Sequence, residues 1–262
     1  MRRCYYSIHM CLKRAIKNKW FLVSVVLAAV LFIMDLMPFF LDSITEIEGE
    51  TYYRYDIVSL MKLSGLTMML GFSLVASSLP YSGAFCDDYE TGTLISFMSR
   101  STGMGYAVGT VTACGISSFL CTFIAQLICI GFYKIFIPIW DGMSESESGL
   151  LLDGQFILFL FCLAVRSSLR AAFFAIVALA LSTVVKNKYV VYSVPLILYF
   201  FLMKLGYGVF NVPGYLNVLG VYFHYVFGDE YEILSLLYTL VFTIASGVIA
   251  GAVLLRKVRR CL

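Results

Sequence analysis

Charged residues are scarce in this chain: Lys, Arg, Asp and Glu make up 13% of its 262 residues, against about 25% in soluble domains. Proline (5 residues) and histidine (2 residues) are also few, whereas hydrophobic residues reach 61% and the mean hydropathy is +0.89. A chain this apolar excludes disorder, a soluble enzyme and a nucleic-acid-binding protein. The composition therefore indicates an integral membrane protein.

Motifs for nucleotide or metal chemistry are missing. No Gly-x-x-x-x-Gly-Lys-Ser/Thr motif occurs, and no lysine is followed by serine or threonine. The two histidines form no His-Glu-x-x-His zinc motif, and the longest predicted cytoplasmic segment, 81–105, is far shorter than a nucleotide-binding domain. We expect a protein that is not an enzyme and binds no cofactor, so that any uphill transport would be powered by another chain.

Six apolar segments have about the length needed to cross a bilayer as helices. A spanning helix needs about 20 residues, because about 30 Å of hydrocarbon is crossed at about 1.5 Å per residue. In lipid, backbone polar groups must be satisfied within the protein, which favours helices. The predicted spans are 20–41, 57–80, 106–137, 154–185, 189–205 and 233–255. We therefore expect an all-α integral membrane protein with six transmembrane helices in one transmembrane domain.

Basic residues gather on one side of these spans. Thirteen of the 19 Lys and Arg residues lie before the first span, after the last span, or in the connections 81–105 and 186–188. Because positive charge stays cytoplasmic, both termini are expected inside a multi-pass protein of a bacterial cell membrane. The acids of the opposite side are Asp42, Glu46, Glu48, Glu50, Asp56, Asp141, Glu145, Glu147, Asp153, Asp229, Glu230 and Glu232.

Two segments outside the spans are expected to lie in the membrane interface. Residues 1–19 place Ile8 and Leu12 on one helical face and bases elsewhere, a pattern typical of a basic amphipathic helix on lipid. The alternative is a basic flank that only orients the first span. Residues 206–232 combine aromatic residues with Gly and Pro, which favours a re-entrant segment on the outer side. Its lone His224 is expected to be an ordinary interfacial residue.

The segment 81–105 carries a short amphipathic helical pattern. Acids come first, where the positive end of a helix dipole favours them, and Arg100 follows at the end that favours a cation. Apolar residues recur at i, i+3 and i+4. The acids are Asp87, Asp88 and Glu90, and the apolar residues are Leu94, Phe97 and Met98. Such a helix either docks onto a partner or rests its apolar face on the bilayer surface.

Ionisable residues inside the predicted spans form one expected layer. Counted from the cytoplasmic ends of their spans at about 1.5 Å per residue, they fall in the outer third of the bilayer. They are Asp35, Lys62, Arg166, Arg170 and Lys204. We expect Asp35 to pair with Arg170 and the surplus bases to line an outer vestibule. The alternative is that the bases only snorkel to the outer headgroups.

Cysteines and small residues in the spans are expected to be structural. None of the eight cysteines lies in a predicted outer loop, and no Cys-x-x-Cys pair occurs, so we expect free thiols and no metal site. Short polar or small side chains at helical spacing let helices approach closely. They are the stripe Ser118, Thr122 and Gln126 and the pairs Gly105–Gly109 and Gly247–Gly251.

The sequence Glu90-Thr-Gly-Thr-Leu94 resembles the acid-x-Gly-Thr-Leu start of the coupling helix in the membrane subunits of ATP-binding cassette (ABC) exporters of the type-2 permease class. Arg100 and Tyr106 follow it, as in that family. The similarity runs the whole length: a basic interfacial helix, six spans with both termini inside, and re-entrant segments before the last span.

The resemblance implies that residues 87–100 form the coupling helix, seated in a groove of a separate ATPase subunit, with residues 4–17 bracing the contact. The implied roles are ionic contacts by Asp87, Asp88 and Glu90, apolar contacts by Leu94, Phe97 and Met98, and completion of the element by Gly92, Thr93 and Arg100. It also implies a second permease subunit, identical or related, surrounding membrane lipids, and ATP with Mg bound by the ATPase subunits alone.

The expected function is therefore a permease subunit that exports a peptide, an antibiotic or a lipid-like substrate. Two alternatives come from other classes. One is an ATP-independent secondary transporter or channel, which inverted repeats would mark. The other is a membrane regulator without transport activity. Nucleic acid is not an expected partner.

Overall fold

The structure is a computed structural model that describes residues 2–47, 50–53, 56–64, 69–100, 102–139, 154–185, 187–204 and 232–260. The described part of the chain is overwhelmingly helical, with one two-stranded β-hairpin. Of the expected re-entrant segment 206–232, only Glu232, the first residue of a helix, is among the described residues. His224 lies outside them.

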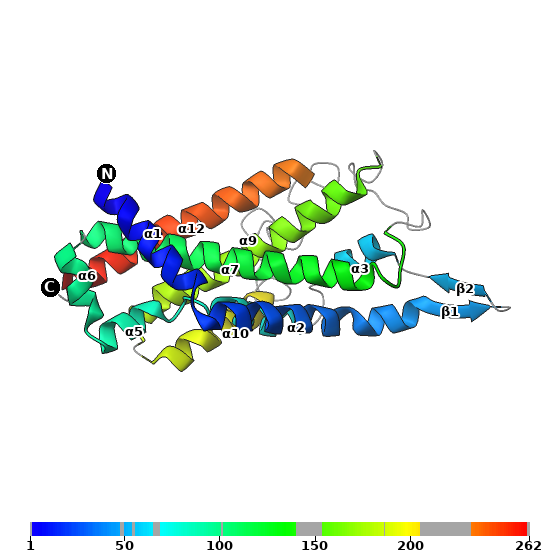
Figure 1. The fold of residues 1–262 in the computed structure, drawn as a ribbon, viewed down its shortest axis with the longest axis horizontal. Coiled ribbons are helices and arrows are strands. Elements are labelled where there is room, and N and C mark those ends of the chain that lie inside the picture. Colours follow the sequence, from blue (N-terminus) through cyan, green and yellow to red (C-terminus); the bar gives the residue numbers. More distant parts are fainter. Residues whose placement is uncertain are drawn as a thin grey trace.

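Four helices in the described residues are long and apolar enough to cross a membrane, which supports the membrane assignment. They run along the long axis of the molecule (Figure 1). They are α2 (Lys19–Ser43), α7 (Gly103–Tyr133), α9 (Phe156–Ser182) and α12 (Glu232–Arg260). The six-span arrangement and its orientation stay predictions.

The other two predicted spans form shorter helices. Segment 57–80 is not one helix, because α3 (Ile57–Leu63) ends at Ser64, whose backbone is extended with ψ 119°. The chain becomes helical again in α4 (Met69–Ser78). Segment 189–205 forms α10 (Lys188–Lys204), whose 17 residues would be about 26 Å long, slightly less than the hydrocarbon thickness.

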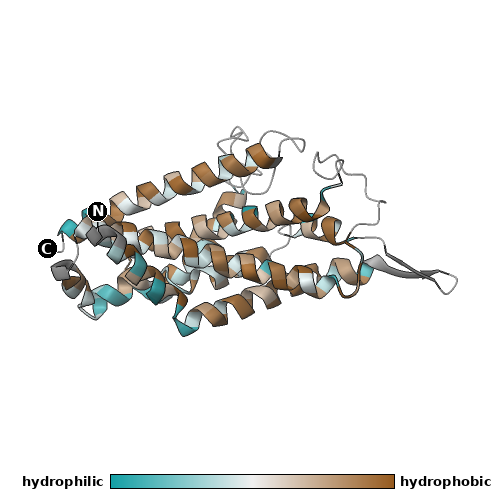
Figure 2. Cartoon of the chain, turned by 45° about the horizontal axis from the view of Figure 1, so that its top comes forward, coloured by the Kyte–Doolittle hydropathy of each residue, from teal (hydrophilic) through white to brown (hydrophobic). Residues whose placement is uncertain are grey.

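Polar elements gather at one end of the molecule, together with both termini (Figure 1). This basic end holds α1 (Arg2–Ile16), α5 (Ala84–Glu90) and α6 (Thr93–Arg100). Figure 2 shows hydrophobic residues along the long helices and hydrophilic ones concentrated at this end. That distribution is typical of a protein whose long helices lie in lipid and whose two ends lie in water.

A β-hairpin at the opposite end is an addition to the all-α architecture that the sequence predicts. Strand β1 (Ile44–Ile47) pairs antiparallel with β2 (Glu50–Tyr53), with Ile44 opposite Tyr53 and Ile47 opposite Glu50. Isoleucine, threonine and tyrosine favour strands. The prediction missed the hairpin because four-residue strands are too short to stand out beside spans of 20 residues or more.

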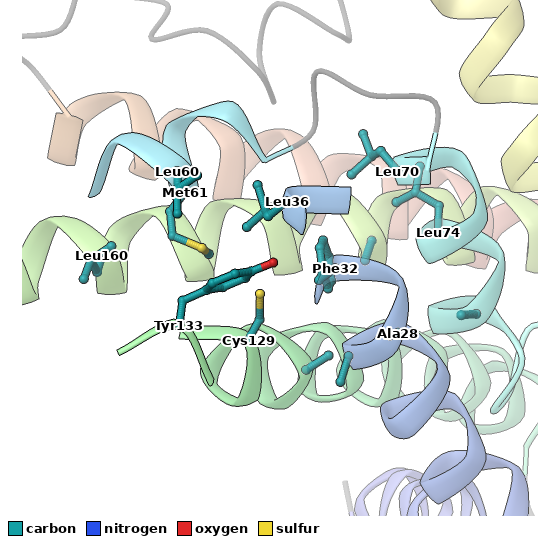
Figure 3. Packing of buried hydrophobic residues seen from close by; sticks show 14 of the residues in the cluster. Ala28, Phe32, Leu36, Leu60, Met61, Leu70, Leu74, Cys129, Tyr133 and Leu160 are labelled. Atoms are coloured by element: carbon teal, nitrogen blue, oxygen red, sulfur yellow. The ribbon is translucent and has the colours of Figure 1, made fainter. Parts of the chain in front are cut away.

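The main hydrophobic core joins α2, α3, α4, α7 and α9 (Figure 3). Phe32 and Leu36 of α2 face Cys129 and Tyr133 of α7 within it, and the Tyr133 hydroxyl donates to the carbonyl of Ile33 at 2.7 Å. A backbone carbonyl that accepts a second hydrogen bond from a neighbouring helix fixes the register of the two helices. This bond pins α2 to α7 near the end that holds the hairpin.

A second core, at the basic end, is built around the contact between α1 and α7. Ser7, Cys11 and Ala15 are spaced four residues apart on α1 and are at most 3% exposed. A Cβ atom on Gly109 would lie 3.2 Å from the carbonyl oxygen of Ser7. The buried face of α1 is therefore a row of small residues packed on protein, which differs from the apolar, lipid-facing stripe expected from the sequence.

Adding one methyl group at Gly109 should separate α1 from α7. Gly109→Ala places a Cβ against the Ser7 backbone, which has little room to move, and we expect a loss of about 1–3 kcal/mol of stability. Burial raises the pKa of the Cys11 thiol and shields it. Alkylation of Cys11, read by peptide-resolved mass spectrometry, should therefore be slow in the native protein and faster in Gly109→Ala.

The matched control is Gly131→Ala on the same helix, where a Cβ would meet nothing within 4 Å. This change should leave Cys11 protected and stability unchanged or up to about 1 kcal/mol higher, because alanine favours helix. Equal alkylation of Cys11 in the two variants would show that α1 does not depend on the small-residue contact.

Candidate functional site

The segment predicted to couple to a partner folds as two short helices joined by a tight turn. Thr91 is the C-cap residue of α5, and the next residue, Gly92, has φ +69°, a left-handed conformation that glycine adopts without strain. Thr91 Oγ1 donates to the carbonyl of Asp87 at 2.6 Å and lies 3.0 Å from Thr93 Oγ1. The turn thereby sets the direction of α6 relative to α5, and the two helices form one unit, the α5–α6 element (residues 84–100).

Asp88 is the centre of this element. Its side chain is 1% exposed, and it accepts hydrogen bonds from three side chains. Arg14 Nη1 donates to Oδ1 at 2.5 Å, Thr93 Oγ1 donates to Oδ1 at 3.0 Å, and the Tyr106 hydroxyl donates to Oδ2 at 2.9 Å. Since the donors come from α1, α6 and α7, one carboxylate of α5 connects four helices. We call these four residues the Asp88 network.

The Arg14–Asp88 pair is asymmetric in its exposure to water. The Arg14 side chain is 42% exposed, whereas that of Asp88 is 1% exposed. Burial disfavours the charged form of Arg14, but the hydrogen bond to Asp88 and the charge of Asp88 outweigh this effect and raise the pKa of Arg14. The guanidinium is therefore held in its charged form, and it supplies the positive charge beside the buried Asp88 carboxylate.

Asp87 points to a different partner. Lys188, at the start of α10, donates to Asp87 Oδ1 at 3.4 Å, and both side chains are about 40% exposed. An ion pair this exposed contributes little to stability. It nevertheless brings the beginning of α10 next to α5, from a position 101 residues further along the chain.

The structure corrects the expected docking face. Leu94 is 6% exposed and Phe97 is half-buried with its ring 5.8 Å from that of Tyr106, so both pack against the chain itself. Asp88, expected to form ionic contacts with bases of a partner, is buried, and its carboxylate is bound by Arg14, Thr93 and Tyr106 instead. The acids Asp87 and Glu90 remain accessible. The side chains of Met98 and Arg100 lie outside the described residues.

The exposed side chains of the α5–α6 element make up its accessible face. Ile95 is 71% exposed and Tyr89 is 39% exposed, and Glu90 and Thr91 are exposed beside them. An exposed isoleucine, an aromatic ring and a carboxylate on one short element form a surface of mixed character. Such a mixture is typical of a protein contact, where apolar anchors are surrounded by polar groups.

The expected layer of intramembrane charges separates into two groups. Asp35, Arg166 and Arg170 are at most 8% exposed. Arg170 interacts electrostatically with Asp35, which attracts it, and with Arg166, which repels it. By contrast, Lys62 and Lys204 are exposed, and Lys62 Nζ lies 5.4 Å from the centre of the Phe159 ring. A direct Asp35–Arg170 ion pair stays a prediction, and the exposed lysines fit the snorkelling alternative better than a shared vestibule.

An open apolar cleft of about 720 Å³ lies between α7, α9 and α12. It is lined almost entirely by aliphatic residues and glycines. Gly247 and Gly251 of α12 both face it, and a Cβ on Gly251 would meet nothing within 4 Å. Of the pair expected to let helices approach closely, Gly251 only borders the cleft, whereas a Cβ on Gly247 would lie 3.7 Å from Val111 Cγ1 of α7, an ordinary van der Waals contact. By contrast, Gly109 of the other pair does make a close helix contact.

Cysteines do not build a further centre in the described residues. Six cysteines are buried and form no disulfide bond: Cys11, Cys86, Cys114, Cys121, Cys129 and Cys162. No cluster of three or more metal-ligating side chains occurs among the described residues. The stripe of Ser118, Thr122 and Gln126 is buried on α7. The Asp88 network is therefore the most developed polar arrangement at the basic end.

Sequence analysis gave no individual role to Arg14, which it included only in the bracing residues 4–17, or to Tyr106, which it named only as following the motif. Arg14 was one of several bases in a flank, and nothing distinguishes it in isolation from Lys13 or Lys17. Its signal is positional: it comes directly before Ala15 and three residues after Cys11, at the edge of the small-residue face of α1. A base at the edge of a helix–helix contact can reach a buried acid on the next element.

In comparisons with known proteins, no protein-family model matches the chain, and no curated protein matches it.

Removing Arg14 should destabilise the protein more than neutralising Asp88. Arg14→Met leaves a charged carboxylate buried with only neutral donors, which we expect to lower the unfolding free energy by about 3 kcal/mol. Asp88→Asn removes the buried charge and leaves a guanidinium that can turn to water, so we expect about 1–1.5 kcal/mol. Unfolding by SDS in mixed micelles measures both.

The double variant Arg14→Met/Asp88→Asn tests this account. It removes both charges and should be more stable than Arg14→Met alone, which gives a favourable coupling energy in a double-mutant cycle. If the two single effects simply add, the ion pair does not contribute as a pair and the asymmetry has another origin.

Proposed function

We propose that this chain is the permease subunit of an ABC exporter, in which the α5–α6 element receives movement from a separate ATPase subunit. The observation that carries the proposal is the Asp88 network. It joins a small element with an exposed face to a long apolar helix through a single buried carboxylate.

Transmission of force requires a stiff connection between the docking element and the membrane helices. Tyr106 lies in the first turn of α7, and Arg14 lies near the end of α1, which continues through a short turn into α2. A displacement of α5 therefore acts on the beginnings of two long helices. A loop tied to its own helix alone would absorb the same displacement by bending.

The surface that meets the ATPase would be the accessible face of the α5–α6 element. Ile95 is the apolar anchor, because it is 71% exposed on an element at the basic end of the molecule. Glu90 and Asp87 supply negative charge to basic residues of the partner. Asp88 and Leu94 are buried and would not touch the ATPase. Their role would be to keep the α5–α6 element folded so that its accessible face can dock.

ATP and Mg would be bound by the ATPase subunits, since this sequence carries no phosphate-binding motif. A second permease, identical or related, would complete the transporter. Among the expected substrates, the cleft between α7, α9 and α12 favours a lipid-like one, because its lining matches an acyl chain and offers almost no hydrogen bonds to a peptide.

Two other functions are compatible with apolar long helices. An ATP-independent transporter could use Asp35, Arg166 and Arg170, which are buried between helices. A membrane regulator could use the α5–α6 element only as a docking surface. The exporter is favoured because the element is both exposed on one face and braced on the other by α1 and α7.

Placing a charge at Ile95 should uncouple transport without harming the fold. Ile95→Asp is expected to weaken ATPase docking by about 2 kcal/mol or more, roughly thirtyfold, because it puts a carboxylate at the apolar anchor. The measurements are the amount of ATPase that co-purifies with the tagged chain from native membranes and the ATP-dependent efflux in proteoliposomes.

The matched control is Ile135→Asp. Ile135 is 77% exposed and lies just after α7, at the end away from the α5–α6 element. It should leave co-purification unchanged, as should the conservative Ile95→Val. Transport of cargo by the purified chain alone, with no ATPase and no ATP, would exclude the exporter proposal and favour the secondary transporter.

A further inference from the structure

A second cavity, of about 380 Å³, opens at the basic end between α1, α5 and α10. It differs from the apolar cleft in character, because polar and basic groups line it. Its main residues are Arg14, Asn18, Trp20, Asp87, Lys188 and Tyr189. The cavity shares Arg14 and Asp87 with the proposed coupling contacts, but the inference below does not depend on the proposed function.

The cavity presents donors suited to an anion. Arg14 uses Nη1 for Asp88, and its guanidinium has further N–H groups. Lys188 has three N–H groups, of which one bonds Asp87 at a long distance of 3.4 Å. Lys17 and Lys19 are exposed on either side of Asn18 in the sequence. Arg14 pairs with Asp88 and Lys188 pairs with Asp87, so an added anion would use the N–H groups that these two pairs leave.

Two helices also begin at this cavity. Asn18 accepts from the backbone N–H of Trp20 at the start of α2, and Asn187 accepts from the backbone N–H of Tyr189 at the start of α10. The positive ends of both helix dipoles therefore lie beside the two cationic side chains. This arrangement reinforces the preference for negative charge that the cations establish.

Aromatic residues place the cavity at the level of the lipid headgroups. Trp20 is 57% exposed and Tyr189 is 74% exposed, each at the first turn of an apolar helix. Tryptophan and tyrosine are enriched at this depth in membrane proteins. Exposed apolar side chains continue from the cavity along the two helices, including Val23 on α2 and Val190 on α10. The surroundings thus suit a phosphate group with acyl chains attached.

We propose that this cavity binds the phosphodiester headgroup of an anionic phospholipid. The phosphate lies between Arg14 and Lys188 and competes with Asp87 for the ammonium of Lys188. The acyl chains lie against the apolar surfaces of α2 and α10. Basic pockets between transmembrane helices bind anionic headgroups in this way.

Native mass spectrometry of the purified full-length chain, titrated with phosphatidylglycerol or phosphatidylcholine, tests the proposal. Phosphatidylglycerol should bind more tightly than phosphatidylcholine. Lys188→Gln should weaken phosphatidylglycerol binding about fivefold, the effect of one lysine near an anionic headgroup. Lys188→Arg should retain it. The matched control is Lys257→Gln on α12, a base at the same end that does not line the cavity.

Separate titrations with inorganic phosphate and with glycerol 3-phosphate distinguish a lipid from a soluble ligand. Strong, Lys188-dependent binding of either one would overturn the lipid assignment and make the cavity a site for soluble phosphate. Equal weakening by Lys188→Gln and Lys257→Gln would overturn the cavity as the site, leaving general attraction between the basic end and the lipid. Loss of ATPase co-purification in Lys188→Gln with unchanged lipid binding would assign the cavity to an acidic segment of a protein partner.

Discussion

A carboxylate that has lost its water must be surrounded by donors, and Asp88 imposes this requirement on the whole basic end of the molecule. No single element supplies enough donors, so α1, α6 and α7 must all meet at α5. The arrangement is demanding, because a missing donor leaves a buried charge that costs several kcal/mol. The same requirement makes the arrangement specific, since few alternative packings would bring three donors to one side chain.

Small residues make this meeting possible. Arg14 reaches Asp88 only because α1 lies close against α7, and that close approach needs the side chains of Ser7, Cys11 and Ala15 to be short and Gly109 to have none. Packing and electrostatics therefore depend on each other at this end. The small-residue contact fixes the position of Arg14 along α7, and the ion pair with Asp88 then keeps α1 from rotating about its own axis.

Much of the fold follows from the sequence through length and hydropathy. Four apolar segments appear as long helices, even with Pro38 inside α2 and two arginines inside α9, because a helix is the structure that lipid permits. The break between α3 and α4 could not be predicted from hydropathy, since Ser64 is as compatible with a span as Ser73, and each serine hydroxyl donates to the carbonyl three residues earlier although only Ser73 lies within a helix. Local backbone geometry decided that difference.

The candidate site was harder to predict than the fold, because sequence pattern does not say which face of a short helix is covered. Leu94 and Phe97 form an apolar face at i and i+3, and both a partner and the chain itself could bury it. The chain does so here, through Tyr106 and the core at the basic end. Ile95, one residue from Leu94, then becomes the exposed apolar group. A partner would therefore contact Ile95, a residue that the i, i+3, i+4 pattern of apolar residues assigns to the polar side of the helix.

Asp87 and Asp88 are neighbours in the chain but bind different partners around α5. These two partners connect the Asp88 network with the cavity at the basic end. Asp88 holds Arg14 in the network, whereas Asp87 holds Lys188 at the mouth of the cavity. Arg14 belongs to both, since its guanidinium binds Asp88 and also lines the cavity. An anion in the cavity would draw on the same charge that holds the α5–α6 element to α1. If the cavity binds an anion as proposed, its occupancy and the stiffness of the element would be coupled through the Arg14 side chain, in both directions.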